Sequence, residues 1–299
     1  MNNLRILGRP IGESHQKSYS FTSETPIHLA VTASGNDVTV TTHDGLDVFV
    51  ELSWYGVNTD WIGDTVDVRF DSETSTLVID TEANEHVPPA DFAPKGPAFG
   101  FIRTSHREKR GGAFMFATNV DIAITLPRAS SVESVTRSGD LAMSGQFSAL
   151  TARSVSGDIQ CVTPEASPLM HSAHVATTSG DIALRAKVGA VVATSTSGDI
   201  VIQRAENASI STSSGDIEVG VVRGEMPGTI ECKSKSGDVV VRVTEGLSVS
   251  LDASTRSGEI ANAIPLDEDS VGENGDFATD CAISIQTSSG DVRIKKSVL

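Results

Sequence analysis

Short runs in which every second residue is apolar make up most of the chain. Five such runs precede residue 81, at 28–32, 38–42, 46–52, 66–70 and 77–80, and the clearest run covers 119–127. Alternation with a period of two is typical of β-strands that bury one face, and no segment shows sustained helical periodicity. The segment 71–74 is typical of the turn of a hairpin. The pattern therefore predicts an all-β protein with very little helix.

One phrase recurs eight times after residue 130, and repetition on this scale indicates a repeat architecture. Its centre is Ser-Gly-Asp in seven copies and Ser-Gly-Glu in one. We predict that the glycine and acidic positions form structural turns; they are Gly139, Asp140, Gly157, Asp158, Gly180, Asp181, Gly198, Asp199, Gly215, Asp216, Gly237, Asp238, Gly258, Glu259, Gly290 and Asp291.

The residues around each turn repeat as faithfully as its centre. Apolar residues stand two and four positions after the glycine, with Asn262 as the single exception. A serine or threonine always stands three positions before the glycine. An alternating arm on each side of a turn fits two architectures, a row of β-hairpins or the coils of a solenoid.

The stretches between the copies favour coils. Hairpins would need a second regular turn signal between copies, whereas these stretches are irregular, as at 164–168 and 224–228. One fixed corner, combined with other corners of variable length, is what stacked coils permit. We therefore predict a single-domain parallel β-helix (β-solenoid) with an N-terminal β-sheet and cap region.

Each residue of the turn has a predicted role. Glycine supplies the positive φ of a sharp corner, and the aspartate and serine side chains bond the corner's own backbone. The hydroxyl groups three positions before the glycine are expected to form an internal ladder. Stacking would place the acidic side chains about 4.8 Å apart, where like charges repel unless something screens them. Local hydrogen bonding is the preferred explanation, and bound calcium is the alternative.

The chain is expected to divide into a loosely held N-terminal arm (1–24), a β region with a cap (25–129) and the solenoid (130–299). Within the cap, segment 83–117 has no strand or helix pattern and combines phenylalanines with basic residues. In an acidic protein this mixture suggests contact with an anionic partner or a membrane surface; the alternative is an insertion that folds back over the sheet. The candidate contact residues are Phe99, Phe101, Arg103, Arg107, Lys109, Arg110, Phe114 and Phe116.

Charge and hydropathy restrict the partners and the location. The formal net charge of −16 argues against nucleic acid as a partner. The start of the chain lacks the apolar core of a signal peptide, and no apolar run is long enough to span a membrane. These features predict a cytoplasmic protein, with peripheral membrane association as an option. Cys161, Cys232 and Cys281 match no zinc spacing and are expected to be buried thiols.

No group of residues has the pattern of a catalytic or metal site. His171 and His174 form His-x-x-His without a third ligand nearby. Segment 267–280 is acidic but fails the EF-hand pattern, and we take it as a surface loop. The repeated carboxylates are equivalent to one another, whereas acid–base catalysis needs two in distinct environments. We therefore predict no catalytic residues, no metal site and no cofactor, and a protein that is not an enzyme.

The repeated phrase, Ser/Thr-x-Ser-Gly-Asp-apolar-x-apolar, follows a run that ends in Leu126-Pro127. In these features the chain resembles the DUF4097 family of bacterial β-strand-repeat proteins, which are regarded as adhesins, over about residues 25–296. The resemblance implies a parallel β-helix, a tie to the cell envelope or its stress systems, and no catalytic residues.

Two hypotheses for function follow. The first is a non-catalytic β-solenoid scaffold or adhesin-like interaction protein, whose partner is an unidentified protein or an envelope component. The second is a carbohydrate-binding or carbohydrate-active β-helix, for which Trp54, Tyr55 and Trp61 are candidate aromatic contacts outside the repeats. The solenoid ends also offer a route to self-association, because the strand at 292–294 would leave an open end.

Overall fold

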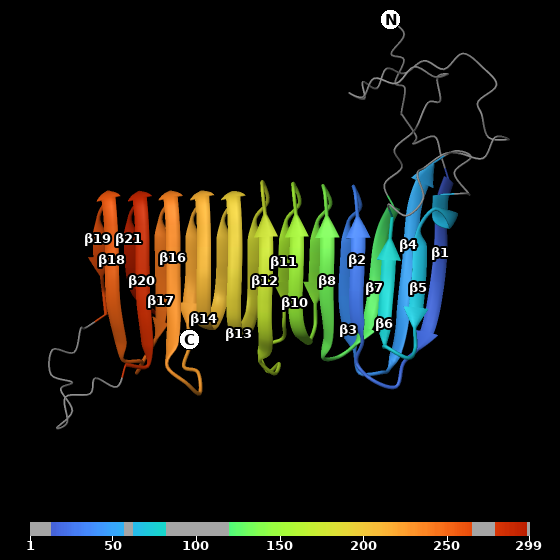
Figure 1. Ribbon diagram of the computed structural model, residues 1–299, viewed down its shortest axis with the longest axis horizontal. Coiled ribbons are helices and arrows are strands. Elements are labelled where there is room, and N and C mark those ends of the chain that lie inside the picture. The colour runs from blue at the N-terminus through green and yellow to red at the C-terminus, as the bar shows by residue number, and fades with distance from the viewer. Residues whose placement is uncertain (1–12, 57–61, 82–119, 265–278, 298–299) are drawn as a thin grey trace, which may run out of the picture.

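The computed structural model describes residues 13–56, 62–81, 120–264 and 279–297. Within these ranges the chain is almost entirely β-strand, with a single 3₁₀ turn, η1 (Ile62–Asp64). The strands form two rows that face each other across a shared core, and Figure 1 shows them stacked side by side along the long axis. The expectation of an all-β fold with very little helix is confirmed.

We call the row of strands that precede the Ser-Gly-Asp turns row A. From the N-terminal end of the stack to the other end, row A consists of β5 (Asp67–Asp71), β6 (Thr76–Asp80), β2 (His28–Ala33), β8 (Ser130–Thr136), β10 (Phe147–Ser154), β12 (Met170–Thr177), β13 (Ile182–Ser197), β14 (Ile200–Ser214), β16 (Gly228–Ser236), β20 (Cys281–Ser289) and β18 (Val249–Ser257).

Row B holds the strands that follow the turns. In the same direction, row B consists of β1 (Glu13–Thr22), β4 (Asp47–Gly56), β7 (Val120–Pro127), β3 (Val38–His43), β9 (Leu141–Ser144), β11 (Ile159–Val162), the first parts of β13 and β14, then β15 (Ile217–Val221), β17 (Val239–Thr244), β21 (Val292–Ser297) and β19 (Ile260–Asn262). The long strands β13 and β14 run through both rows, so all the strands belong to one hydrogen-bonded sheet.

Most neighbouring strands are parallel, and only the N-terminal end is antiparallel among the described residues. There β4 pairs with β1 and β7, and β5 pairs with β6. The β5–β6 hairpin turns at the predicted place. Residues 13–22, which we expected to belong to a loosely held arm, instead form the edge strand β1 along the whole length of β4. This expectation was wrong because β4 offers ten paired positions, a partner that the sequence of the arm does not reveal.

The order of strands in the stack departs from the order in the chain at both ends. We call one row A strand and the row B strand level with it a rung. The β2–β3 rung lies between β6–β7 and β8–β9, and the β20–β21 rung lies between β16–β17 and β18–β19. The prediction that the C-terminal strand leaves an open end is therefore wrong. The terminal rung is β18–β19, whose strands each have one neighbour among the described residues.

The core is built from columns of equivalent residues, one from each rung. The residues two positions after the turn glycines, from Leu141 to Val292, have at most 1% of their surface exposed in every rung but the terminal one. There Ile260 is 46% exposed. Asn262, the single polar residue in the column four positions after the glycines, belongs to the same rung. A polar residue is tolerated at this point of the column because the terminal rung is covered by a neighbouring rung on one side only.

The turn glycines are required by close approach of the backbone. A Cβ atom placed on Gly198 would lie 2.2 Å from the carbonyl oxygen of Gly180, and the equivalent distances at the other seven glycines are between 1.8 and 2.2 Å. We expected positive φ to be the reason, but φ is not positive at Gly198. Four of the eight, Gly215, Gly237, Gly258 and Gly290, do have φ between 150° and 154°. The steric requirement is the one that all eight share.

Replacing Gly198 by alanine should lower the free energy of unfolding by about 2–3 kcal/mol, because the methyl group has no space against the Gly180 carbonyl. Valine should cost more, since it is larger and branched at Cβ. The control is Ser197→Ala at the neighbouring exposed position, where we expect a change within about 0.5 kcal/mol. Urea denaturation measures all three variants. Equal midpoints for Gly198→Ala and Ser197→Ala would show that the turns are not in contact.

Candidate functional site

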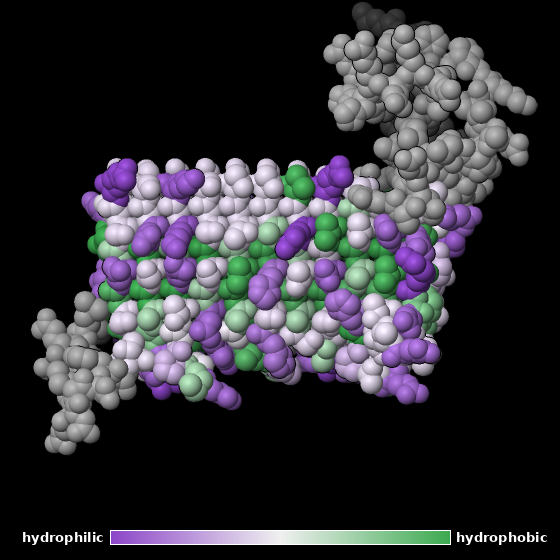
Figure 2. Space-filling view, viewed as in Figure 1, coloured by the Kyte–Doolittle hydropathy of each residue, from purple (hydrophilic) through white to green (hydrophobic). Residues whose placement is uncertain are grey.

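The edge that carries the Ser-Gly-Asp turns is a continuous ladder of carboxylate-to-backbone hydrogen bonds. Oδ1 of each aspartate accepts the backbone N–H of the acidic residue in the next rung, at N–O distances of 2.8–3.1 Å. The ladder runs through Asp37, Asp140, Asp158, Asp181, Asp199, Asp216, Asp238, Asp291 and Glu259. Figure 2 shows pale, weakly hydrophilic residues along most of one long edge of the stack, interrupted by a few strongly hydrophilic ones. The structure thus brings all eight predicted turns together on one edge.

The first member of the ladder, Asp37, was missed in the sequence. Its turn reads Ser34-Gly35-Asn36-Asp37, with an asparagine inserted between the glycine and the aspartate. Oδ1 of Asp37 accepts the Asp140 N–H at 3.1 Å. The signal that could have identified it is the apolar alternation that follows, which continues as in the other copies. The last member, Glu259, is the one copy with glutamate, and it donates to Asp291 in the terminal rung.

Each aspartate accepts its hydrogen bond from the backbone of the neighbouring rung. We expected the donor to be the backbone of the aspartate's own turn, and this expectation was wrong. Each backbone N–H therefore partly neutralises a carboxylate that faces its equivalents above and below. Arg293 adds to this near the end of the ladder, where its guanidinium bonds Asp238 at 2.9 Å and Asp291 at 2.7 Å. The backbone hydrogen bond from Asp291, together with Arg293, holds the pKa of Asp238 below its ordinary value.

The hydroxyl groups three positions before the glycines are buried in every rung but the terminal one. Direct contact between rungs occurs where Thr177 donates to Ser195 at 3.1 Å. Other hydroxyls bond the turn backbone; Ser154, for example, accepts the Gly157 N–H at 2.8 Å, and Thr255 donates to the Gly290 carbonyl at 3.1 Å. The buried hydroxyls of Thr136 and Ser234 have no hydrogen-bond partner among the described residues. The expected hydroxyl ladder is thus present in part, and the turn backbone takes most of these bonds.

A shallow notch of about 290 Å³ interrupts the outer face of row B. Two β-bulges form it, because β13 has an extra residue opposite β14 at Arg185-Ala186, and β14 has one opposite β15 at Gln203-Arg204. Gly220 of β15 lies opposite the second bulge and carries no side chain, which leaves space above it. Bulges re-aim side chains and are common beside functional sites. We define the notch by Glu165, Arg185, Arg204, Glu218, Gly220 and Arg242.

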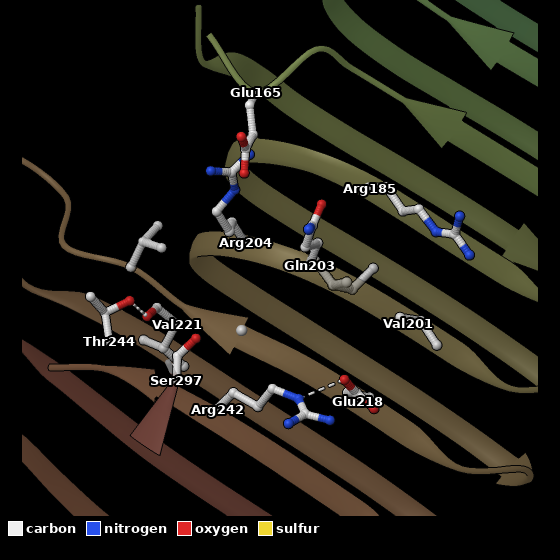
Figure 3. Close-up of a pocket in the computed structure, with 13 residues that line it drawn as sticks. Glu165, Arg185, Val201, Gln203, Arg204, Glu218, Val221, Arg242, Thr244 and Ser297 are labelled. Carbon is white, nitrogen blue, oxygen red and sulfur yellow. Dashed lines mark hydrogen bonds and ion pairs between the residues drawn. The ribbon is translucent and has the colours of Figure 1, made fainter. Parts of the chain in front are cut away.

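The charged side chains of the notch come from separate rungs, as Figure 3 shows. Nε of Arg242 donates to Glu218 at 2.7 Å, and this bond raises the pKa of Arg242. Arg185 and Arg204 form no ion pair with any residue that the structure describes. Nε of Arg204 is buried without a hydrogen-bond acceptor among those residues. The notch was not predicted, because the bulges that build it depend on register between rungs.

The three cysteines lie in the core, as expected. Cys161 and Cys232 have none of their surface exposed, and Cys281 is 2% exposed. Burial raises the pKa of the Cys161 and Cys232 thiols to about 12 and that of Cys281 to about 11. A thiol at such a pKa is almost wholly protonated near neutral pH and therefore a poor nucleophile.

The other residues considered in the sequence are dispersed. His171 and His174 are exposed on β12, and within the described ranges no three His, Cys, Asp or Glu side chains gather in a way that could hold a metal ion. Trp54 is 6% exposed and belongs to the core, whereas Tyr55 is 43% exposed. Trp61, segment 83–117 with all eight of its candidate contact residues, and most of segment 267–280 lie outside the described residues. Asp280, at the end of the acidic segment, pairs with Arg223 at 2.7 Å.

The model of the Toastrack family, DUF4097, matches residues 28–295. Because this match covers most of the chain, the chain belongs to that family, and the resemblance carried by the repeated phrase is confirmed. No curated protein matches the chain. Among the described residues, no helix is both long enough and apolar enough to cross a membrane.

Several solved structures are similar to the chain. One is a candidate adhesin from Bacteroides fragilis, 14% identical, with 95% of this chain and 97% of that chain covered and a TM-score of 0.49. A candidate adhesin from Parabacteroides merdae is 11% identical, with 95% and 96% covered and a TM-score of 0.45. A candidate lipid-binding protein from Parabacteroides distasonis is 10% identical, with 96% and 98% covered and a TM-score of 0.41.

Asp199→Asn should change the free energy of unfolding by at most about 0.5 kcal/mol, because the amide oxygen can still accept the Asp216 N–H and the repulsion within the ladder falls. Asp199→Ala leaves that N–H without its acceptor and should cost about 1 kcal/mol. Thermal denaturation with and without a chelator checks both variants and the calcium alternative. A melting temperature that drops with chelator, recovers with calcium and no longer responds in Asp199→Asn would show that the ladder binds metal.

The native protein should react with a thiol-specific reagent at pH 8 at least about a hundredfold more slowly than the unfolded chain, because its thiols are buried and protonated. Ellman's reagent in the presence and absence of urea measures the two rates. Rapid modification of any of the three cysteines under native conditions would show that its rung opens readily.

Proposed function

We propose that the chain is a non-catalytic, adhesin-like interaction scaffold. In this proposal it is a parallel β-solenoid whose two outer faces hold side chains at fixed spacing for contact with another macromolecule. The observation that carries the proposal is the carboxylate ladder. It commits the repeated acidic residues, the charged groups that every copy of the repeat carries, to joining one rung to the next.

Rigidity supports this role. The rungs between the two ends of the stack are fixed by parallel pairing in both rows, by the ladder at the turn edge and by columns of buried apolar residues. A surface that is ordered before binding loses little conformational entropy on contact, which favours recognition over a wide, flat area. The family relationship agrees with the proposal, since solved structures similar to the chain are described as candidate adhesins.

A carbohydrate-active protein is the second candidate, and one observation favours it. Glu165 and Glu218 line the same notch in different surroundings, because Glu218 is bonded to Arg242 and Glu165 forms no ion pair with a described residue. Two carboxylates in distinct environments are what glycoside hydrolysis requires. Against this candidate, Glu218 is already bonded to the Arg242 guanidinium.

The scaffold proposal is tested by binding of the labelled chain to envelope fragments of the source organism. One variant alters the row A face (Thr194→Lys with Ser211→Lys), and another alters the row B face (Gln160→Lys with Ala183→Lys); each pair lies on adjacent strands. We expect one of these variants to bind at least tenfold more weakly, because bulky charges disrupt a flat contact. Asp199→Asn, which changes the turn edge only, should bind normally.

The enzyme alternative is tested in parallel by release of reducing ends from a panel of polysaccharides. We expect none above the buffer control. Product formation that disappears in Glu165→Gln or Glu218→Gln would replace the scaffold proposal with a catalytic one. Equal envelope binding by the wild type and both face variants would also contradict the scaffold proposal.

A further inference from the structure

The arginines of the notch are unusual in their setting. The protein carries a formal net charge of −16, yet Arg185, Arg204 and Arg242 all line one depression on the row B face. They belong to β13, β14 and β17, so the strand β15 with Gly220 lies between the last two. Arg204 and Arg242 are therefore on strands about 10 Å apart. In Figure 3 the Arg242 side chain is turned toward Glu218 and Arg204 extends toward Glu165, so these two long side chains would rotate to meet one ligand above Gly220.

Arg204 has the least satisfied side chain of the three. Its Nε is buried and has no acceptor among the described residues. A buried donor without a partner costs more than an exposed one, and the cost is greater when the donor is charged. The guanidinium carries five N–H donors in a rigid fork that matches the oxygens of a carboxylate or a phosphate. Because Nε itself is buried, an oxyanion above the notch would bond the terminal N–H groups of this half-buried guanidinium.

Two carboxylates line the notch, Glu218 and Glu165, and they differ in whether they are already paired with an arginine. Glu218 is bonded to Nε of Arg242, which leaves the terminal nitrogens of that guanidinium as further donors. Glu165 lines the same notch and forms no ion pair with any described residue. Glu165 therefore competes with a bound anion for the arginines, and its removal should strengthen binding. Substitution of Glu165 should therefore change the affinity for the anion in the opposite direction to substitution of an arginine.

We propose that the notch is a binding site for an oxyanion group, a carboxylate or a phosphate, carried by the ligand that the row B face meets. The Arg204 guanidinium binds the oxyanion; Arg185 flanks it from the adjacent rung on one side, and Arg242 from two rungs away on the other. Val201, which is 37% exposed, gives the notch an apolar side on which the uncharged part of the ligand packs. The inference deepens the scaffold proposal, since it names the chemistry recognised by one of its two faces.

The test is a titration of the full chain, followed by NMR chemical shifts of the backbone amides at constant pH and ionic strength. Inorganic phosphate probes the phosphate group, glucuronate probes a carboxylate on a sugar, and glucose is the neutral control for glucuronate. We expect shifts around Gly220 with phosphate, with glucuronate or with both, and none with glucose. Shifts with phosphate alone or with glucuronate alone would identify which of the two groups the ligand carries.

Four variants locate the site. Arg204→Gln should weaken binding tenfold or more, because charge-assisted hydrogen bonds are lost. Arg185→Gln, at an exposed position, should weaken it by a smaller factor and serves in case Arg204→Gln fails to fold. Glu165→Gln should strengthen binding by a few-fold. Arg153→Gln is the matched control, since Arg153 is an exposed arginine on β10 of row A.

The proposal is overturned if neither anion binds at concentrations of tens of millimolar, or if glucose shifts the same amides as glucuronate. It is also overturned if Arg153→Gln weakens binding as much as Arg204→Gln and Arg185→Gln do, because the effect would then reflect overall charge. Failure here together with intact envelope binding would leave the scaffold proposal standing. Absence of envelope binding together with anion binding at the notch would contradict the scaffold proposal and leave the anion site standing.

Discussion

Adjacent turns approach each other so closely that a single methyl group has no room between them. At every one of the eight repeated turns a Cβ would lie about 2 Å from a backbone oxygen of the neighbouring rung. This contact sets the positions of the aspartates, whose Oδ1 atoms then reach the next backbone N–H at 2.8–3.1 Å. Glycine and aspartate therefore act as a pair, since the glycine permits the approach and the aspartate supplies the bond. The columns of apolar residues stack in register because the turns do.

The ladder also explains how an acidic protein can line up its carboxylates. Each aspartate of the ladder accepts a hydrogen bond from a backbone N–H, and Arg293 neutralises the pair Asp238 and Asp291. Equivalent groups in equivalent surroundings cannot divide the tasks of acid and base between them. The regularity that stabilises the stack thus argues against chemistry at the turn edge, and attention moves to places where the regularity is broken. The notch at Gly220 is such a place, because two bulges shift the register there.

Both ends of the stack are arranged out of chain order, and this arrangement has a physical consequence. The β20–β21 rung is enclosed between two others, so the C-terminal strand is not an edge. The edge is β18–β19, which has the shortest strand, an exposed Ile260 and the polar Asn262. A short edge strand with a polar residue is a poor template for pairing with another chain. At the opposite end the antiparallel strands β1 and β4 close row B.

The sequence by itself determined the all-β class, the eight turns and the family, because each depends on local alternation and on a phrase that repeats along the chain. It also marked Asn262 as an exception without showing why. Only the tertiary structure decided which rungs are neighbours, since parallel pairing joins residues far apart in the chain and local patterns do not encode that order. Gly198 illustrates the limit: the sequence indicated a glycine that must be glycine, but the reason, the Gly180 carbonyl, belongs to another rung. The notch is the product of register between rungs, so its arginines could be recognised as a group only after the strands were stacked.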